Sequence, residues 1–227
     1  MITAENVTKI YATKVSRRVI IRDLSFHFPG GGDFAILGGA GAGLSSVLNM
    51  IGGLSHPTRG TIRRQGTTSW PFGQMHYEKM MSAHQNIRFL CRVLGERDFE
   101  AVENRVRELT GFDQQLRRPS GTLRQDEKRA IAFALSLCFS FDIMLLDGMP
   151  TFFTFETRKK MKDAFLEKRE QSTVVLATKN PSEIKKSFSH VLVLHNGTGR
   201  LYDDRQDAIE AFKEINANAP EKAEEAE

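Results

Sequence analysis

The chain has 227 residues, of which 40% are hydrophobic and 26% are charged, and its formal net charge is +4. This length is sufficient to bury a sizeable core within one large domain. The excess of basic residues is small and scattered, which argues against the concentrated basic surface of a nucleic-acid-binding protein. The longest apolar stretch, residues 130–146, is interrupted by an aspartate and by serines. A membrane span needs roughly 20 apolar residues, so this stretch is not predicted to cross a membrane.

The two cysteines, Cys91 and Cys138, lie in apolar surroundings without metal-ligand spacing. We therefore expect buried thiols in a reducing compartment rather than a disulfide. Residues 1–9 lack the apolar segment of a secretory signal. Residues 1–215 are expected to form a single domain. Residues 216–227 carry four Glu against one Lys and are expected to form a disordered acidic tail.

The first half of the chain predicts short strands followed by a helical region. Residues 2–7, 18–21 and 24–28 are predicted to form antiparallel strands, and the apolar run 34–37 is typical of a buried strand. Helical spacing follows over residues 45–51. Residues 75–125 contain no convincing strand, and residues 98–109 place their apolar side chains on one helical face. This region is therefore predicted to be a helical insertion.

Strands and helices alternate in the second half of the chain. A helix is predicted over residues 130–138. The runs 143–146, 174–177 and 191–194 are continuously apolar, as expected of parallel strands that are covered on both faces. Helices over 156–169 and 182–188 separate these strands, and another over 205–215 follows the last one. This alternation predicts an α/β fold with a parallel sheet.

The most informative motif lies between the strand at 34–37 and the helix at 45–51. It fits the G-x-x-x-x-G-K-[ST] phosphate-loop template, with Leu44 at the lysine position and Ser45 at the Mg²⁺-ligand position. Backbone N–H groups at a helix N-terminus favour phosphate, whereas the plainer alternative is a glycine-rich turn without a ligand. In either case Ser45 is expected to cap the helix. The candidate nucleotide-binding residues are Gly38, Gly39, Ala40, Gly41, Ala42, Gly43, Leu44, Ser45 and Ser46.

Several separate segments, taken in order, resemble the nucleotide-binding subunits of ABC transporters over residues 1 to about 210. These segments are 6–11 (NVTKIY), 21–25 (IRDLS), 53–62 (GLSHPTRGTI) and the phosphate loop. Three further segments, at 69–71, 85–89 and 132–136, resemble the branch that energises export of capsular polysaccharide and other surface glycans. The resemblance implies that Tyr11 stacks on adenine, where the alternative is a plain strand-edge aromatic. It also implies that Asp147 binds Mg²⁺, where the alternative is a turn cap.

The resemblance implies an α/β cassette with a mixed parallel sheet core, N-terminal antiparallel strands and an inserted helical lobe. ATP and Mg²⁺ are the implied ligands, with Ser45 and Asp147 as metal ligands. The implied partners are a polysaccharide-export permease and a second cassette, in a homodimer or in a heterodimer with an active paralogue. The protein would then lie peripherally on the cytoplasmic face of the inner (cell) membrane, and no nucleic-acid partner is expected.

Most catalytic positions nevertheless depart from the family pattern. Leu44 cannot contact phosphate as a lysine does, which forfeits roughly 1.5–3 kcal/mol. Gly148 replaces the glutamate that orients the attacking water, and Lys179 replaces the switch histidine. The signature motif falls on residues 123–127, where Asp126 and Glu127 put carboxylates at the docking point of a γ-phosphate. Glu78 stands at the glutamine that senses Mg²⁺, and Thr154 at an expected aspartate.

These departures favour a non-hydrolysing accessory cassette that has no catalytic residues and binds ATP and Mg²⁺ weakly. The alternative is an active transport ATPase, while a small P-loop kinase is disfavoured because it would also need the loop lysine. Residues 70–86 are predicted to receive the permease, the alternative being that they pack the inserted lobe. Their apolar members are Trp70, Phe72, Met75, Tyr77, Met80 and Met81. A second apolar cluster, Phe152, Phe153 and Phe155, suggests another protein contact.

Overall fold

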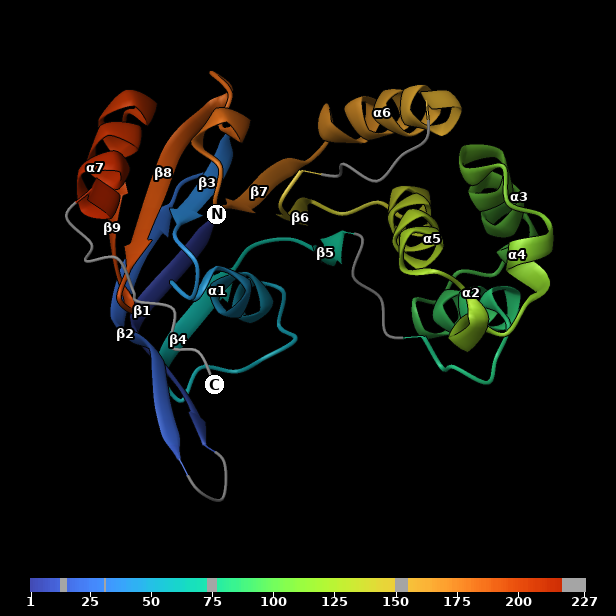
Figure 1. The fold of residues 1–227 in the computed structure, drawn as a ribbon, viewed down its shortest axis with the longest axis horizontal. Coiled ribbons are helices and arrows are strands. Elements are labelled where there is room, and N and C mark those ends of the chain that lie inside the picture. Colours follow the sequence, from blue (N-terminus) through green and yellow to red (C-terminus); the bar gives the residue numbers. More distant parts are fainter. Residues whose placement is uncertain (13–15, 31, 73–76, 150–154, 218–227) are drawn as a thin grey trace. The chain divides into compact units, whose positions relative to one another are not determined.

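The computed structural model describes residues 1–12, 16–30, 32–72, 77–149 and 155–217. These residues divide into two compact units (Figure 1). The first unit combines the N-terminal 65 residues with the chain from Val175 onward, and the second unit spans Gly66–Val174. The phosphate loop belongs to the first unit, whereas the helical insertion belongs to the second.

The first unit contains two sheets. In one, β1 (Ile2–Ala12) pairs antiparallel with both β2 (Arg17–Phe28) and β4 (Arg59–Arg64). In the other, β3 (Asp33–Gly38) runs parallel to β7 (Thr173–Thr178) and to β8 (Phe188–His195), and β9 (Thr198–Tyr202) adds antiparallel to β8. Helix α1 (Leu44–Ile51) follows β3, and α7 (Arg205–Ala217) packs on β8 and β9 (Figure 1). A mixed parallel sheet and an N-terminal antiparallel sheet are the predicted fold class.

Burial explains why β3 forms the centre of its sheet. Residues 34–37 are apolar and at most 1% exposed, so each side of the strand is covered, as expected of a central parallel strand. Phe28, at the end of β2, stacks on Phe34 with ring centroids 4.7 Å apart. Because β3 ends at Gly38, this core fixes where the phosphate loop begins.

The second unit joins two parallel strands to a set of helices. The strands are β5 (Thr68–Phe72) and β6 (Ile143–Asp147). The helices are α2 (Ala83–Val93), α3 (Phe99–Thr110), α4 (Gln114–Arg117), α5 (Gln125–Cys138) and α6 (Phe155–Arg169), with a 3-10 turn, η1 (Ser120–Thr122), before α5. Phe133 of α5 lies edge-on to Phe72 of β5, which anchors the helices on the strands.

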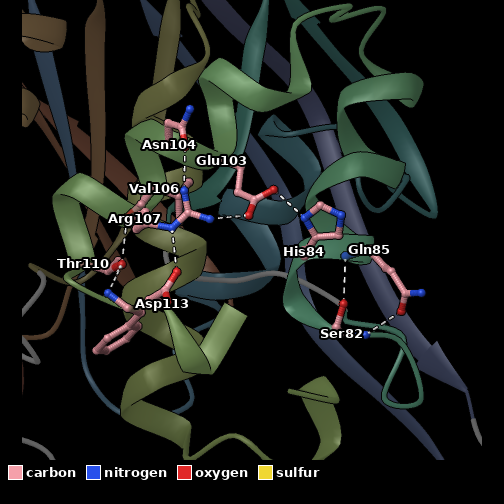
Figure 2. A network of polar contacts seen from close by, with 10 residues as sticks. Ser82, His84, Gln85, Glu103, Asn104, Val106, Arg107, Thr110 and Asp113 are labelled. Carbon is pink, nitrogen blue, oxygen red and sulfur yellow. Dashed lines mark hydrogen bonds and ion pairs between the residues drawn. The ribbon is translucent and has the colours of Figure 1, made fainter. Parts of the chain in front are cut away.

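Polar side chains join α2 to α3 (Figure 2). Glu103 is only 13% exposed and bonds to the ring of His84 through one carboxylate oxygen. Its other oxygen accepts a hydrogen bond of 2.7 Å from Arg107, which also donates to Asp113 at 3.1 Å. Since burying an unpaired carboxylate is costly, this network fixes the pairing of the two helices.

Several predicted elements need correction. The predicted helix over 182–188 is wrong: only the single turn η2 (Pro181–Glu183) is present, and Phe188 already begins β8 opposite Asp33. The two strands predicted at 18–21 and 24–28 are one strand, β2, which continues through Asp23 at a φ of 47°. Helix α5 begins five residues before the predicted residue 130, and α7 extends to Ala217.

Candidate functional site

The phosphate loop has the backbone geometry that its glycines predict. Gly41 and Gly43 have φ values of 75° and 97°, in the left-handed region. Gly43 is the N-cap of α1 and supplies no side-chain hydrogen bond to the first turn, so the prediction that Ser45 caps this helix is wrong. No side chain caps the first turn of α1, and a helix N-terminus of this kind favours an anion.

A hollow of about 260 Å³ lies at this loop. Leu44 contributes to its wall, but the side chain is only 6% exposed and belongs to the buried face of α1. The position of the missing lysine is therefore occupied by a core residue. The described residues that line the hollow are Arg18, Ile20, Gly39, Gly41, Ala42, Gly43, Leu44, Ser45, Ser46 and Lys179. Of the predicted loop residues, Gly38 and Ala40 are not among them.

Tyr11 lies next to the phosphate loop. Its hydroxyl is 3.4 Å from the hydroxyl of Ser46, and its side chain is 45% exposed. The ammonium of Lys9 lies 5.1 Å from the ring centroid, within the range of a cation–π contact. The structure thus brings Tyr11 to the loop, and its stacking on adenine stays a prediction.

The second predicted metal ligand belongs to the other unit. Asp147 is the exposed last residue of β6, and Gly148 follows at a φ of 78°. As a glycine, Gly148 has no side chain that could orient a water molecule. Ser45 and Asp147 both carry oxygen ligands of the kind that Mg²⁺ prefers, and their joint role in binding this ion stays a prediction.

The segment at the signature position caps its own helix. Glu127 accepts a hydrogen bond of 2.8 Å from the backbone N–H of Arg124, and its side chain is 7% exposed. The guanidinium of Arg124 forms an ion pair of 3.0 Å with Asp126. Two carboxylates in the first turn of α5 therefore already complement the positive end of this helix.

The loop predicted to receive a permease is partly core. Tyr77 donates a hydrogen bond of 2.9 Å to the carbonyl of Lys128, and burial raises the pKa of its phenol. Trp70 lies edge-on to Phe139 and Phe141, and Phe72 is 6% exposed. Among the described apolar residues of this loop, Met80 and Met81 are the exposed ones, at 86% and 41%. Met75, Thr154, Phe152 and Phe153 lie outside the described residues, as does the side chain of Phe155.

Asn86 fastens this loop to the chain before α5. Its side-chain N–H groups lie within hydrogen-bond distance of the Ser120 hydroxyl at 3.0 Å and the carbonyls of Glu78 and Ser82 at 3.1 and 3.0 Å. Its oxygen accepts a 2.8 Å bond from the Glu78 backbone. Backbone hydrogen bonds also run from Ser120 to Met81 and from Gly121 to Lys79. Residues 78–83 and 118–121 are thus joined along their length.

The remaining chemical groups add little to the site. Both cysteines are free. Cys91 is buried as predicted, but Cys138 is only half-buried at the end of α5, where burial raises its pKa to about 12. Among the described residues, no three His, Cys, Asp or Glu side chains gather to hold a metal ion. No helix in those same parts of the chain is long and apolar enough to cross a bilayer.

Two cations at the hollow, Arg18 and Lys179, were not predicted as site residues. Lys179 had a usable signal, since it directly follows an apolar strand, and ligands of parallel sheets bind at the carboxyl ends of strands. Its sequence position alone identifies it only as the residue that replaces the switch histidine. Arg18 had no such signal, because its place depends on the pairing of β1 with β2.

Comparisons with known proteins identify the family. The family described as ABC transporter matches residues 21–150. The chain is 30% identical to the capsule polysaccharide export ATP-binding protein CtrD of Neisseria meningitidis serogroup B, over 95% of this chain and all of that protein. It is also 30% identical to the polysialic acid transport ATP-binding protein KpsT of Escherichia coli, over 94% and 99% of the two chains.

Solved structures share the fold. The ATP-binding cassette MJ0796, solved as a dimer in a post-hydrolysis state with ADP and Pi, aligns with a TM-score of 0.71 and 18% identity. That alignment covers 89% of this chain and 98% of the other. An ATP-binding subunit of an ABC transporter aligns with a TM-score of 0.69 and 17% identity, over 96% and 98% of the two chains. The chain has the ABC cassette fold and belongs to the ABC transporter family.

Proposed function

We propose that this chain is the cassette subunit of an exporter of capsular or other cell-surface polysaccharide. Support comes from relatives whose names state capsule polysaccharide export and polysialic acid transport and whose whole length it matches. The phosphate loop, with its uncapped helix N-terminus, supports a role in binding nucleotide.

The subunit is further proposed to bind ATP without hydrolysing it. The observation that carries this proposal is that the start of α5 is capped by its own side chain. The carboxylate of Glu127 accepts a hydrogen bond from the backbone N–H of Arg124. In the resembled family this segment docks a γ-phosphate, which two carboxylates would repel. The absence of a general base at Gly148 adds to this, because a positioned base contributes on the order of 10²–10⁴ in rate.

A second candidate is an active transport ATPase. It is favoured by the relatives, which are named ATP-binding proteins and match nearly the whole chain at 30% identity. Steady-state hydrolysis by the purified chain, alone and with its permease, separates the two. We expect no turnover above a buffer blank. A turnover of about 1 s⁻¹ or more, the low end of typical enzyme rates, would establish the second candidate.

ATP and Mg²⁺ are proposed to bind weakly. The phosphates would meet the backbone N–H groups at the start of α1, and the Ser45 hydroxyl with the Asp147 carboxylate would hold the metal. Mg²⁺ would neutralise phosphate charge when bound. Calorimetric titration with ATP, with and without Mg²⁺, tests this, and an Asp147→Asn variant should lose the Mg²⁺-dependent part of the affinity.

The proposed partners are a membrane permease and a second cassette, either a copy of this chain or an intact paralogue. The surface that supports docking is an exposed apolar stripe on α2 formed by Phe89 and Val93. These two residues lie about one helical turn apart and are 61% and 63% exposed. An exposed apolar stripe of this kind is a common protein contact. It would hold the subunit peripherally at the cytoplasmic face of the membrane.

The double variant Phe89→Asp with Val93→Asp tests this surface. We expect the variant to fold and to lose co-purification with the permease. Leu166→Asp is the matched control, because Leu166 lies on α6 of the same unit and is 42% exposed. Retained co-purification of the stripe variant would show that the permease binds elsewhere.

A further inference from the structure

The hollow at the phosphate loop has lost its expected cation but contains two others. Leu44 stands at the lysine position, yet Arg18 and Lys179 line the same hollow as Gly41 and Ser45. Both cations come from segments far from the loop in sequence. They lie in the same unit as the loop, so their placement beside it is internal to that unit.

Strand register places Lys179. Strands β3 and β7 are parallel neighbours, and Leu37 pairs with Thr178. The next residues are Gly38, which begins the loop, and Lys179. Thr178 is 3% exposed, and its hydroxyl bonds to Glu183 at 2.6 Å and to the backbone N–H of Asn180 at 3.0 Å. The backbone around Lys179 is therefore held in place.

Arg18 reaches the loop from the antiparallel sheet. It pairs with Tyr11 across β1 and β2, and the Tyr11 hydroxyl in turn lies 3.4 Å from Ser46. A Cβ built on Gly41 would lie 3.9 Å from Nη2 of Arg18. The guanidinium thus lies against the glycine backbone of the loop.

The charge in the hollow is not balanced by this unit. Within the described residues, neither Arg18 nor Lys179 forms an ion pair, and no carboxylate is among the residues that line the hollow. The N-terminus of α1 adds partial positive charge at the same place. Three sources of positive potential that converge without a counter-charge are expected to attract an anion.

We propose that Lys179 and Arg18 replace the lost loop lysine and bind the phosphate oxygens of a nucleotide. This inference deepens the proposed function and rests on its claim that the loop binds nucleotide. Lys179 would act as a mobile point charge and Arg18 as a planar donor that can bind two oxygens at once. Charge is therefore relocated from α1 to the neighbouring strands rather than lost.

Calorimetric titration of the full chain with ATP, inorganic tripolyphosphate and adenosine tests the proposal. Lys179→Met and Arg18→Met should each weaken ATP and tripolyphosphate binding by roughly ten- to a hundredfold, and leave adenosine binding unchanged. Lys186→Met is the matched control, because Lys186 is also exposed and lies close in sequence without lining the hollow. Its affinities should stay within about twofold of the unmodified protein.

A rescue experiment makes the test specific. Adding Leu44→Lys to Lys179→Met returns a cation to the same hollow and should recover most of the lost affinity for tripolyphosphate. Circular dichroism of every variant checks that the fold is retained. Full affinity in both the Lys179→Met and Arg18→Met variants would overturn the proposal, as would an equal loss for adenosine. Failure of the unmodified protein to bind either phosphate probe at millimolar concentration would also overturn it, whereas export function is judged separately by co-purification with the permease.

Discussion

Replacing Glu127 tests whether the start of α5 is capped by its own side chain. The carboxylate accepts a 2.8 Å hydrogen bond from the Arg124 backbone and is 7% exposed. Hydrogen bonds to charged groups contribute about 1.5–3 kcal/mol, so Glu127→Ala should lower the free energy of unfolding by that amount. Glu127→Gln keeps an acceptor and loses only the charge at the helix end, which costs about 0.3–1 kcal/mol.

Asp126→Ala is the matched control for this series. Asp126 lies in the same turn and pairs with Arg124 at 3.0 Å, but it is 53% exposed, so its loss should cost at most about 1 kcal/mol. Thermal unfolding should show a shift of roughly 2–4 °C for each kcal/mol in a chain of this size. Hydrogen exchange should show faster opening of the first turn of α5 in Glu127→Ala. Equal destabilisation by Glu127→Ala and Asp126→Ala would refute the capping argument.

Three further predictions concern stability. Hydrogen bonds from the backbone and side chain of Thr67 lower the pKa of Asp142 below its ordinary value of 3.8, so its contribution is present at neutral pH and lost as pH falls through that lowered pKa. Asp142→Asn should flatten the acid side of a plot of melting temperature against pH. Glu103→Ala should lower the free energy of unfolding, measured by urea denaturation, by about 1.5–3 kcal/mol. The exposed Glu108→Ala should lower it by at most about 1 kcal/mol. Gly43→Ala should cost more than about 1 kcal/mol by the same assay, because its φ is 97° and its Cβ would lie 2.7 Å from a core isoleucine.

Residue patterns predicted the parts of the fold that depend on local burial. The apolar runs that became β3, β6, β7 and β8 are continuous because each strand is covered on both faces. Strands β4, β5 and β9 were missed because they carry few buried apolar residues; β4 (Arg59–Arg64) has none. The start of α5 was placed too late because its first residues are charged, although Glu127 is buried as a cap.

The loop at 38–46 could be predicted because the spacing of its glycines directly indicates where the backbone takes positive φ values. The residues that line the hollow could not be predicted, because their positions depend on pairing between strands that are far apart in sequence. Lys179 is adjacent to the loop only through the register of β7 on β3, and Arg18 only through β2 on β1. At the level of single positions Leu44 is a lost charge, and the two cations beside the loop become apparent only once the strand pairing is known.

The hydrogen bonds of Asn86 and its neighbours connect two segments of the second unit that are far apart in sequence. Residues 78–83 carry the exposed Met80, and residues 118–121 run into the first turn of α5. The two segments share backbone hydrogen bonds and one buried amide, so displacing one without the other would break these bonds. A partner that displaced Met80 would therefore be expected to displace the chain before α5 as well. This connection between the two segments consists of hydrogen bonds within the chain, so it does not depend on the hydrolysis of a nucleotide.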